Sequence, residues 1–510
     1  MDRQIRRVGI AIVGLFAMLF AQLAYVQVFA ADRIENNVAN TARQIIAEYR
    51  TQRGAILSAD GRVLAESRPL AGALYRYQRR YPQGPLFAAL TGYYSRQYGR
   101  SGLEQSMNAY LSGTAPELAA STFTDLLLGR PKQGGSVVTT MLPSLQEAAQ
   151  QALGSLPGAV VAMDPATGDI LAMVANPTYD PNRLSRGTAE QITKYWSQLN
   201  ADPEKPLISR AKDELYLPGS TFKLITASAA LENGYGALST WPNPHQLPLP
   251  LTSNSIENFG NELCLGGVSQ VTMADAFRES CNVTFAEIGL KLEAEKLAAQ
   301  ARAYGFCPTD PLTQSTCISE TIPFVMPFQT GRFPIPDYFQ KNTPLLAYSA
   351  IGLENDLTNP LQMALVTAAI ANGGHEMQPR LVKEIRDPEG RVVKSFPAVP
   401  FGTPISAKTA AAMRQMMIGV VNNGTGYSAQ IPGIQVAGKT GTATNGPGRA
   451  PNAWFDAFAP AGPGAAPRIA VAVIVLDGGS LGDEATGGRV AAPIAKLVIE
   501  AYCQITKGCS

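Results

Sequence analysis

The sequence predicts an α+β fold, in which an antiparallel sheet flanked by helices is assembled from segments far apart in the chain. Two apolar strands are expected at residues 158–163 and 169–175, joined by a turn-forming stretch. A helix-rich region follows, from about residue 220 to residue 375. The end of the chain returns to strands and one last helix, which are expected at 434–437, 453–459, 469–476 and 490–502.

Three features are expected before the first strand of this sheet. Polar, helix-compatible residues at 32–52 suit a stalk. A hairpin is expected at 54–64, because Asp60 and Gly61 supply turn chemistry between two apolar runs. A periodic helix is expected at 145–153.

The N-terminal segment predicts the cellular compartment. Arg3, Arg6 and Arg7 precede an apolar run at residues 8–29, which is long enough to cross the roughly 30 Å hydrocarbon core of a membrane as a helix. The basic flank should stay in the cytoplasm, so that the rest of the chain lies outside it. A cleaved signal peptide is the alternative, and both interpretations export the remaining residues.

The composition indicates a folded protein of several domains. The chain has 510 residues, of which 45% are hydrophobic and 16% are charged, and this length predicts two or three domains. A net charge of +2 argues against nucleic acid as the main partner. The two histidines, His245 and His375, lie near no cluster of cysteines or carboxylates with metal-ligand spacing. We therefore expect neither a metal site nor a cofactor.

All six cysteines fall in the C-terminal half of the chain. Because disulfides persist in exported proteins, pairing of neighbours predicts three bridges: Cys264–Cys281, Cys307–Cys317 and Cys503–Cys509. Cys281 lies between Ser280 and Asn282, so the first bridge would tether a loop beside these two polar residues. A buried free thiol at Cys281 is the alternative.

Three short motifs stand in order along the chain and supply the parts of an acyl-transfer site. An S-x-x-K motif occupies residues 220–223, an S-x-N motif 280–282, and a K-T-G motif 439–441. Each motif alone is weak, since a second S-x-x-K stands at 209–212 and a second S-x-N at 106–108. Their order and their local context therefore carry the prediction.

Ser220 and Lys223 suit the roles of nucleophile and base. A Pro-Gly break at 218–219 precedes Ser220, and an apolar helix is expected to run from it to about Leu231. Helix positions i and i+3 share a face, so Lys223 lies beside Ser220, and the first turn offers free N–H groups to a developing oxyanion. A serine N-cap followed by a solvated lysine is the alternative.

Lys223 can act as a base near pH 7 only when it is uncharged. A free lysine has a pKa of about 10.4, so the pKa must fall by about three units, or roughly 4 kcal/mol. Burial and a second nearby cation both lower a lysine pKa, and Lys439 is the candidate cation. A Ser-His-Asp triad is disfavoured, because both histidines lie in Pro- or Gly-rich stretches.

Two other motifs lack the context that their mechanisms need. Residues 433–440 match the phosphate-binding P-loop literally. However, Pro432 precedes the first glycine, residues 434–437 are strand-like, and the Gly- and Pro-containing run after Lys439 cannot form a helix. Lys439 is therefore expected on a strand. Residues 478–482 match the G-x-S-x-G elbow, but a polar loop follows where the elbow requires a helix.

A strand that bears Lys439 is useful beside Ser220. Alternation along this strand places Thr440 and Thr442 on one face, with Gly441 between them. The two hydroxyl groups can hold a substrate carboxylate, and a free strand edge can align a peptide through main-chain hydrogen bonds.

With these motifs the chain resembles the class B penicillin-binding proteins, the D,D-transpeptidases of peptidoglycan synthesis, and looks most like their penicillin-binding-protein-A branch. The segments L-P-G-S-T-F-K, S-C-N and A-G-K-T-G-T-A around the three motifs carry the resemblance. Further family-like segments stand at 53–56, 60–65, 102–104, 111–113, 453–455 and 491–493. The chain departs from the family pattern at 351–355, at 358–360 and at Cys281.

The resemblance implies a chain of three parts. Residues 1–31 would form a cytoplasmic basic flank and a transmembrane anchor, and 32–143 an extended, mixed α/β pedestal or dimerisation-like domain. Residues 144–510 would form a transpeptidase domain of the penicillin-binding and β-lactamase-like fold. The implied partners are peptidoglycan stem peptides, β-lactams, the cell membrane and a SEDS-family glycan polymerase, without metal or cofactor.

The resemblance also assigns the first half of a reaction. Ser220 would attack the penultimate D-Ala carbonyl of a stem pentapeptide, and Lys223 would take the proton of its hydroxyl group. Backbone N–H groups of Ser220 and Thr442 would hold the oxyanion. Penicillins, which imitate D-Ala-D-Ala, would acylate the same serine.

The remaining motif residues would complete the reaction. Ser280 and Lys439 would relay a proton to the leaving D-Ala, and Asn282 would orient the peptide. The strand residues Thr440, Gly441 and Thr442 would bind the substrate. An amine of a neighbouring stem would then close the cross-link. The alternatives are a D,D-carboxypeptidase, a β-lactamase or a penicillin sensor on the same fold, and a scaffold protein with an inert site.

Overall fold

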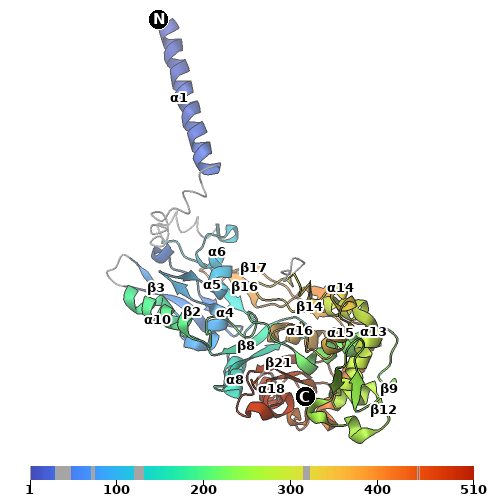
Figure 1. Cartoon of the computed structure of the whole chain (residues 1–510). Coiled ribbons are helices and arrows are strands. Elements are labelled where there is room, and N and C mark those ends of the chain that lie inside the picture. Colours follow the sequence, from blue (N-terminus) through green and yellow to red (C-terminus); the bar gives the residue numbers. More distant parts are fainter. Residues whose placement is uncertain are drawn as a thin grey trace.

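The computed structural model describes the chain over residues 2–28, 48–70, 75–119, 131–313, 322–444, 446 and 448–509. It contains a single N-terminal helix, an N-terminal domain and a larger C-terminal domain (Figure 1). The expected stalk at 32–52 lies mostly outside the described residues.

Helix α1 (Asp2–Val28) is the candidate membrane span. Its segment Arg6–Tyr25 is apolar and long enough to cross a membrane, and none of it is buried against the rest of the chain (Figure 1). An apolar helix that packs on no protein surface suits a lipid environment. The helix coincides with the predicted anchor, and its orientation across a membrane remains a prediction.

The core of the C-terminal domain is a five-stranded antiparallel sheet, as predicted. Its strands are β7 (Gly158–Met163), β8 (Ile170–Asn176), β19 (Ala437–Ala443), β20 (Asn452–Ala459) and β21 (Ile469–Val475). The strand order is β19-β20-β21-β7-β8, so segments from the end of the chain complete the sheet that the first hairpin begins. Strand β19 forms one edge of the sheet.

The predicted start of strand β19 was wrong. A strand is expected from the sequence at 434–437, whereas β19 begins at Ala437 and carries the K-T-G motif. Residues Ile431 and Ile434 bridge each other across a tight turn in which Gly433 has a φ of 78°. The Pro-Gly pair in this turn outweighs the β-branched residues that suggested a strand.

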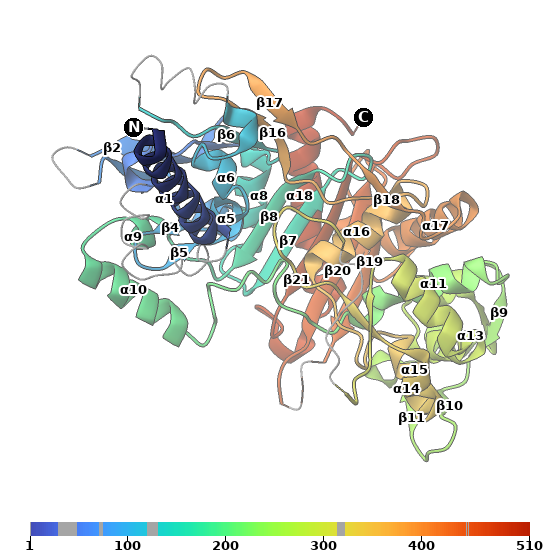
Figure 2. The ribbon, with the colours of Figure 1, turned by 90° about the horizontal axis from the view of Figure 1, so that it is seen from above.

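Both faces of the five-stranded sheet are covered, which explains why most residues of its strands are apolar. Along β21, the even-numbered residues face one core and the odd-numbered residues face the other. Helix α16 (Pro360–Ala371), every residue of which is buried, packs on the first face. Helices α8 (Pro143–Leu153) and α18 (Ala492–Thr506) pack together on the second face (Figure 2).

The N-terminal domain is built on a second sheet of six strands, in the order β17-β16-β6-β1-β2-β3. These are β1 (Ile56–Leu57), β2 (Val63–Pro69), β3 (Tyr77–Arg80), β6 (Ser136–Thr139), β16 (Val382–Arg386) and β17 (Val392–Ser395). The antiparallel pair β1–β2 is the predicted hairpin. Strands β16 and β17 come from late in the sequence, so this sheet ties the two domains together. The proposed boundary after residue 143 remains a prediction.

A buried cluster of charges holds the N-terminal domain together. The Glu104 carboxylate accepts hydrogen bonds from Nε of Arg53 and Nε of Arg79, each at 2.6 Å, and from the hydroxyl of Tyr81 at 3.1 Å. All four side chains are buried. Burial raises the pKa of Glu104, but the two guanidinium groups outweigh it and hold the pKa below its usual value. The family-like segments that contain Arg53 and Glu104 thus meet in one ion-pair cluster.

Replacing Glu104 by Gln should destabilise the N-terminal domain. The substitution leaves two buried guanidinium groups without a counter-charge, and breaking such a buried pair costs about 3–5 kcal/mol. We expect a lower midpoint for this domain in a urea titration read by limited proteolysis. Glu389→Gln, which breaks an exposed pair with Arg391, is the matched control and should cost less than about 1 kcal/mol. Equal midpoints for the two variants would contradict this role of Glu104.

Candidate active site

Ser220 lies on a tight turn rather than in a regular α-helix. The predicted helix begins with the 3₁₀ turn η3 (Gly219–Phe222) and continues as α11 (Lys223–Glu232). Residues three apart lie over one another in a 3₁₀ turn, so Ser220 and Lys223 keep the relation expected from the sequence. The Ser220 side chain is half-buried, and that of Lys223 is fully buried.

Two glycines bring this turn against the edge strand β19. Gly219 has a φ of 53°, and a Cβ there would lie 2.5 Å from the carbonyl oxygen of Thr442. A Cβ at Gly441 would lie 2.9 Å from the carbonyl oxygen of Pro218. Both distances are shorter than a side chain tolerates. Glycine at both positions therefore allows the Ser220 turn to approach the K-T-G strand.

The Lys223 amine contacts the S-x-N motif. Its Nζ donates to the carbonyl oxygen of Ser280 at 2.7 Å and to Oδ1 of Asn282 at 2.8 Å. Asn282 Nδ2 donates to the carbonyl oxygen of Glu257 at 3.3 Å, which turns Oδ1 toward the lysine. An uncharged amine has two N–H groups and one lone pair. The two short bonds use both N–H groups and leave the lone pair available for a proton.

Ser280 occupies a left-handed backbone conformation between α12 (Met273–Arg278) and α13 (Asn282–Ala303). Its φ is 62°, a conformation that costs a residue other than glycine about 1–3 kcal/mol. The N–H of Val283 donates to Oδ1 of Asn258 at 3.1 Å, which fastens the neighbouring loop to this turn. The surrounding contacts thus hold the serine in a conformation that it would not adopt alone.

The disulfide Cys264–Cys281 confirms the predicted bridge beside Ser280, and Cys503–Cys509 confirms a second predicted bridge. Cys317 lies outside the described residues, so its pairing remains a prediction. The first bridge ties the loop that contains Cys264 to the S-x-N turn. Both this loop and the turn contribute to the cavity described below.

The second lysine reaches the same serine from the edge strand. Lys439 Nζ donates to Oγ of Ser280 at 2.9 Å and to the carbonyl oxygen of Thr440 at 2.8 Å, and it lies 5.5 Å from the centre of the Phe277 ring. Lys223 Nζ lies 3.4 Å from the same Oγ. Both lysine side chains are fully buried, so Ser280 Oγ connects two amines that are shielded from water.

Burial lowers the pKa of both amines. It takes the pKa of Lys223 well below its usual value, and the positive charge of Lys439 lowers it further. Burial also lowers the pKa of Lys439, to about 7, against the opposing effect of the Asp456 carboxylate. The shift that a base at position 223 requires therefore has both of the causes expected from the sequence, namely desolvation and a second cation.

A cavity of about 570 Å³ adjoins these side chains. Residues of all three motifs line it, namely Ser220, Ser280, Asn282, Thr440, Gly441 and Thr442. Oγ1 of Thr440 lies 2.6 Å from Oγ1 of Thr425, and the N–H of Gly487 donates to Oγ1 of Thr442 at 3.4 Å. The free edge of β19 thus forms one wall, as the alternation of the two threonines predicted.

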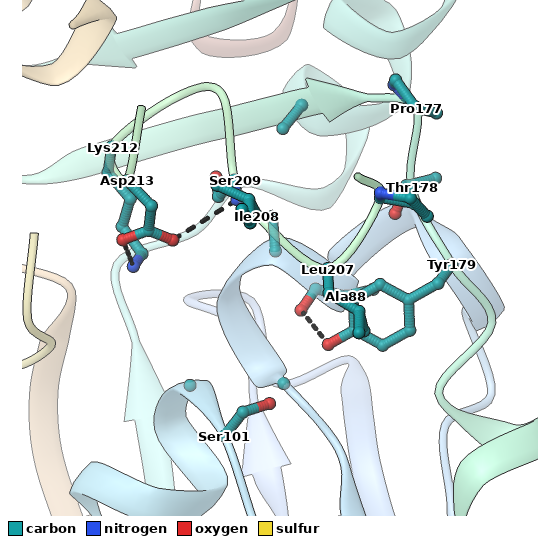
Figure 3. A pocket seen from close by; sticks show the side chains of 15 residues that line it. Ala88, Ser101, Pro177, Thr178, Tyr179, Leu207, Ile208, Ser209, Lys212 and Asp213 are labelled. Atoms are coloured by element: carbon teal, nitrogen blue, oxygen red, sulfur yellow. Dashed lines mark hydrogen bonds and ion pairs between the residues drawn. The ribbon is translucent and has the colours of Figure 1, made fainter. Parts of the chain in front are cut away.

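The second S-x-x-K motif lies at a different and smaller cavity. Ser209 and Lys212 line this space between the two domains, together with Tyr179 and Asp213 (Figure 3). The Lys212 ammonium pairs with the Asp213 carboxylate at 2.5 Å and donates to the carbonyl oxygen of Pro327 at 2.9 Å. The Lys212 amine is thus held by Asp213 and by the carbonyl of Pro327 rather than by the hydroxyl of Ser209.

The P-loop interpretation of residues 433–440 is wrong. Lys439 lies in the middle of strand β19, and the next described element is strand β20 rather than a helix. The elbow-like stretch at 478–482 is followed by the single turn η7 (Gly482–Glu484). Neither stretch has the helix that its mechanism requires.

Several residues of the larger cavity carry no motif and were missed. They come from loops and include Asn258, Phe259, Leu263, Ile351, Leu353, Thr425, Arg449 and Arg489. The departure from the family pattern at 351–355 was a usable signal, because Ile351 and Leu353 belong to it. The other residues reach the cavity only through tertiary contacts that no local pattern shows.

Two parts of the chain match domains of one known family. Residues 158–500 match the penicillin binding protein transpeptidase domain, and residues 53–137 match the penicillin binding protein A dimerisation domain. The chain belongs to the penicillin-binding proteins. This finding confirms the family and the fold class that the motifs predicted.

Similar proteins agree with this classification over almost the whole chain. It is 38% identical to the peptidoglycan D,D-transpeptidase PbpA of Mycolicibacterium smegmatis over 98% of this chain and 99% of that protein. It is 36% identical to PbpA of Mycobacterium tuberculosis over 99% of both. The solved ceftriaxone acyl-enzyme of penicillin-binding protein A from M. tuberculosis is 36% identical, with a TM-score of 0.82, over 89% of this chain and 99% of that one. A D,D-transpeptidase domain from Eggerthella lenta is 32% identical with a TM-score of 0.75, over 89% of this chain and 99% of that one.

Replacing Cys264 and Cys281 together by Ser should loosen the S-x-N turn of this penicillin-binding protein. The bridge spans a sequence separation of 17, and the chain-entropy account gives about 3 kcal/mol for a loop of that size. We expect a Tm lower by several degrees and faster hydrogen exchange at residues 256–283. The double variant Cys503→Ser with Cys509→Ser is the control, and should leave exchange at 256–283 unchanged. Unchanged exchange in the first variant would show that the bridge does not hold the turn.

Proposed function

We propose that, in this peptidoglycan D,D-transpeptidase, Ser220 is the nucleophile and Lys223 is the general base. The observation that carries the proposal is the buried, hydrogen-bonded connection from Lys223 through Ser280 to Lys439, placed beside a cavity that Ser220 lines. The names of the PbpA relatives support the same activity.

In the first step, Ser220 Oγ attacks the penultimate D-Ala carbonyl of a stem pentapeptide. Its proton passes to the uncharged Lys223, whose lone pair is not used by its two short hydrogen bonds. The backbone N–H groups of Ser220 and Thr442 hold the oxyanion. The Ser220 turn and strand β19 approach closely at Gly219, which supports this pairing of donors.

Expulsion of the leaving D-Ala requires a proton on its amine. Ser280 Oγ lies between both lysine amines, so it can pass a proton from Lys223 to the leaving nitrogen while Lys439 stabilises the serine oxygen. Asn282 orients the peptide, and Thr440 with Thr442 hold its terminal carboxylate at the strand edge.

In the second step, an amine of a neighbouring stem attacks the acyl-enzyme, and the new amide forms the cross-link. β-Lactams imitate the D-Ala-D-Ala end and acylate Ser220. The relative from M. tuberculosis supports this, because its structures are acyl-enzyme complexes with ceftriaxone, imipenem and penicillin G.

Helix α1 anchors the enzyme in the cell membrane. Arg3, Arg6 and Arg7 stay in the cytoplasm, so the catalytic domain lies outside it. A SEDS-family glycan polymerase is the proposed membrane partner, and the enzyme acts in cell-wall synthesis during growth or division.

Product analysis tests the proposed activity. The full chain is incubated with a stem pentapeptide ending in D-Ala-D-Ala, with and without an acceptor amine. We expect D-Ala release and a cross-linked product with acceptor, and loss of both by at least a thousand-fold in Ser220→Ala. Ser209→Ala, in the ion-paired motif, is the matched control and should keep the activity. D-Ala release without any cross-link would show a carboxypeptidase instead.

The rate of Ser220 acylation by penicillin should show a bell-shaped dependence on pH. The rate rises as Lys223 loses its proton, which occurs well below the usual lysine range because of burial and Lys439. The rate falls again as Lys439 loses the proton that it offers to Ser280. This descending limb of the profile is expected near pH 7. Stopped-flow measurement between pH 5 and 10 checks this, and a rate that rises only near pH 10 would contradict a neutral Lys223.

A further inference from the structure

Strand β20 carries a buried carboxyl, that of Asp456, in a sheet whose residues are mostly apolar. The five strands of the C-terminal sheet, all of whose residues are described, contain two charged side chains, Lys439 and Asp456. These two residues lie directly opposite each other in the antiparallel pair β19–β20. Directly opposed residues have Cβ atoms about 4.5–5.5 Å apart and lie on the same face of the sheet.

The Asp456 carboxyl is fully buried and lacks a hydrogen-bond partner. It is 0% exposed, and within the described part of the chain neither of its oxygens accepts or donates a hydrogen bond. The Lys439 ammonium does not turn back to it, because it donates to Ser280 Oγ and to the carbonyl oxygen of Thr440. A buried, unpartnered carboxyl is costly to a fold, so its presence beside a catalytic lysine calls for an explanation.

Among the described elements that pack on this face of the sheet, the lysines of the site are the groups that can offer Asp456 a positive charge. On β21 its neighbour is Ala472, and helix α16, which packs over this face, has no titratable side chain. Helix α11 contributes the amine of Lys223. On α17 (Ala407–Asn423), Lys408 is exposed, and Arg414 donates to carbonyl oxygens beyond the end of β20.

We propose that Asp456 is a positioning residue that acts through Lys439: its carboxylate keeps the Lys439 ammonium protonated while that ammonium donates to Ser280 Oγ. The proposal rests on the proposed transpeptidase function. It adds to the three motifs a fourth component of the proton relay, located outside all of them and out of reach of the substrate.

The two groups must titrate together. Burial raises the pKa of Asp456 well above its usual value, and the charge of Lys439 opposes this. Burial lowers the pKa of Lys439, and the carboxylate opposes that. At low pH the carboxyl and the amine each hold a proton. As the pH rises, the pair first releases one of the two protons, and the two groups then share the proton that remains. A carboxyl at position 456 therefore extends the pH range over which the lysine can be charged.

The location of the carboxyl suits this role better than a direct ion pair would. A carboxylate bonded to Lys439 Nζ would compete with Ser280 for the ammonium protons. Asp456 instead acts across the width of two paired strands, so it stabilises the charge and leaves the donors of Lys439 directed at Ser280. An opposite charge at about 4–6 Å typically raises the pKa of a lysine by one unit or more.

The experiment compares the pH dependence of penicillin acylation in four forms of the full chain: wild type, Asp456→Asn, Asp456→Val and Glu376→Gln. Asn keeps the shape of the side chain, and Val suits an apolar strand. Glu376 is the matched control, because it is another buried carboxyl without a hydrogen-bond partner, its pKa is raised by burial alone, and it does not line the cavity. Thermal unfolding verifies that each form is folded.

We expect both Asp456 variants to be acylated at Ser220, with the descending limb of the rate profile shifted to lower pH by about one unit or more. The Glu376→Gln profile should coincide with that of the wild type. Profiles of folded Asp456→Asn that coincide with wild type would overturn the proposal, as would an equal shift in Glu376→Gln. Failure of the wild type itself to be acylated at Ser220 would instead refute the proposed function, and with it this inference.

Discussion

Two lysine amines buried against one serine hydroxyl are the constraint on which the rest of the site depends. Lys223 comes from the start of α11 and Lys439 from the sheet edge, and they meet at Ser280 Oγ. Because both amines are removed from water, neither keeps the pKa of a surface lysine. The helical region and the sheet must stay closed over this point, since exposure of either amine to water would return its pKa to the usual range of a lysine.

The backbone around these amines is adapted to hold them in place. Ser280 has a left-handed conformation and lies between helix α12 and the disulfide-bonded Cys281. Glycines 219 and 441 allow the nucleophile turn and the edge strand to approach more closely than side chains would permit. The mostly apolar sheet beneath supports these strained features, and Asp456 is the one acidic residue of its five strands.

Much of this architecture could be predicted from the sequence, because the relevant signals are local. The hairpin at 158–175 follows from apolar runs around turn residues, and the role of Lys223 follows from its spacing to Ser220. Features set by distant contacts could not be read in this way. Strands β16 and β17 join the N-terminal sheet from far along the chain, and the start of β19 depends on a turn. Asp456 was visible as a charge within an apolar run, but its partner was not.

We infer that Ser220, and no other hydroxyl of the cleft, is the nucleophile that the two buried lysines serve. Mapping of the penicilloylated peptide by mass spectrometry after a brief exposure of the full chain to penicillin tests it most directly. We expect a single modified residue, Ser220, and no modification when Lys223 is replaced by Met. A penicilloyl group on Ser280 or on another residue, or undiminished labelling of Lys223→Met, would contradict it.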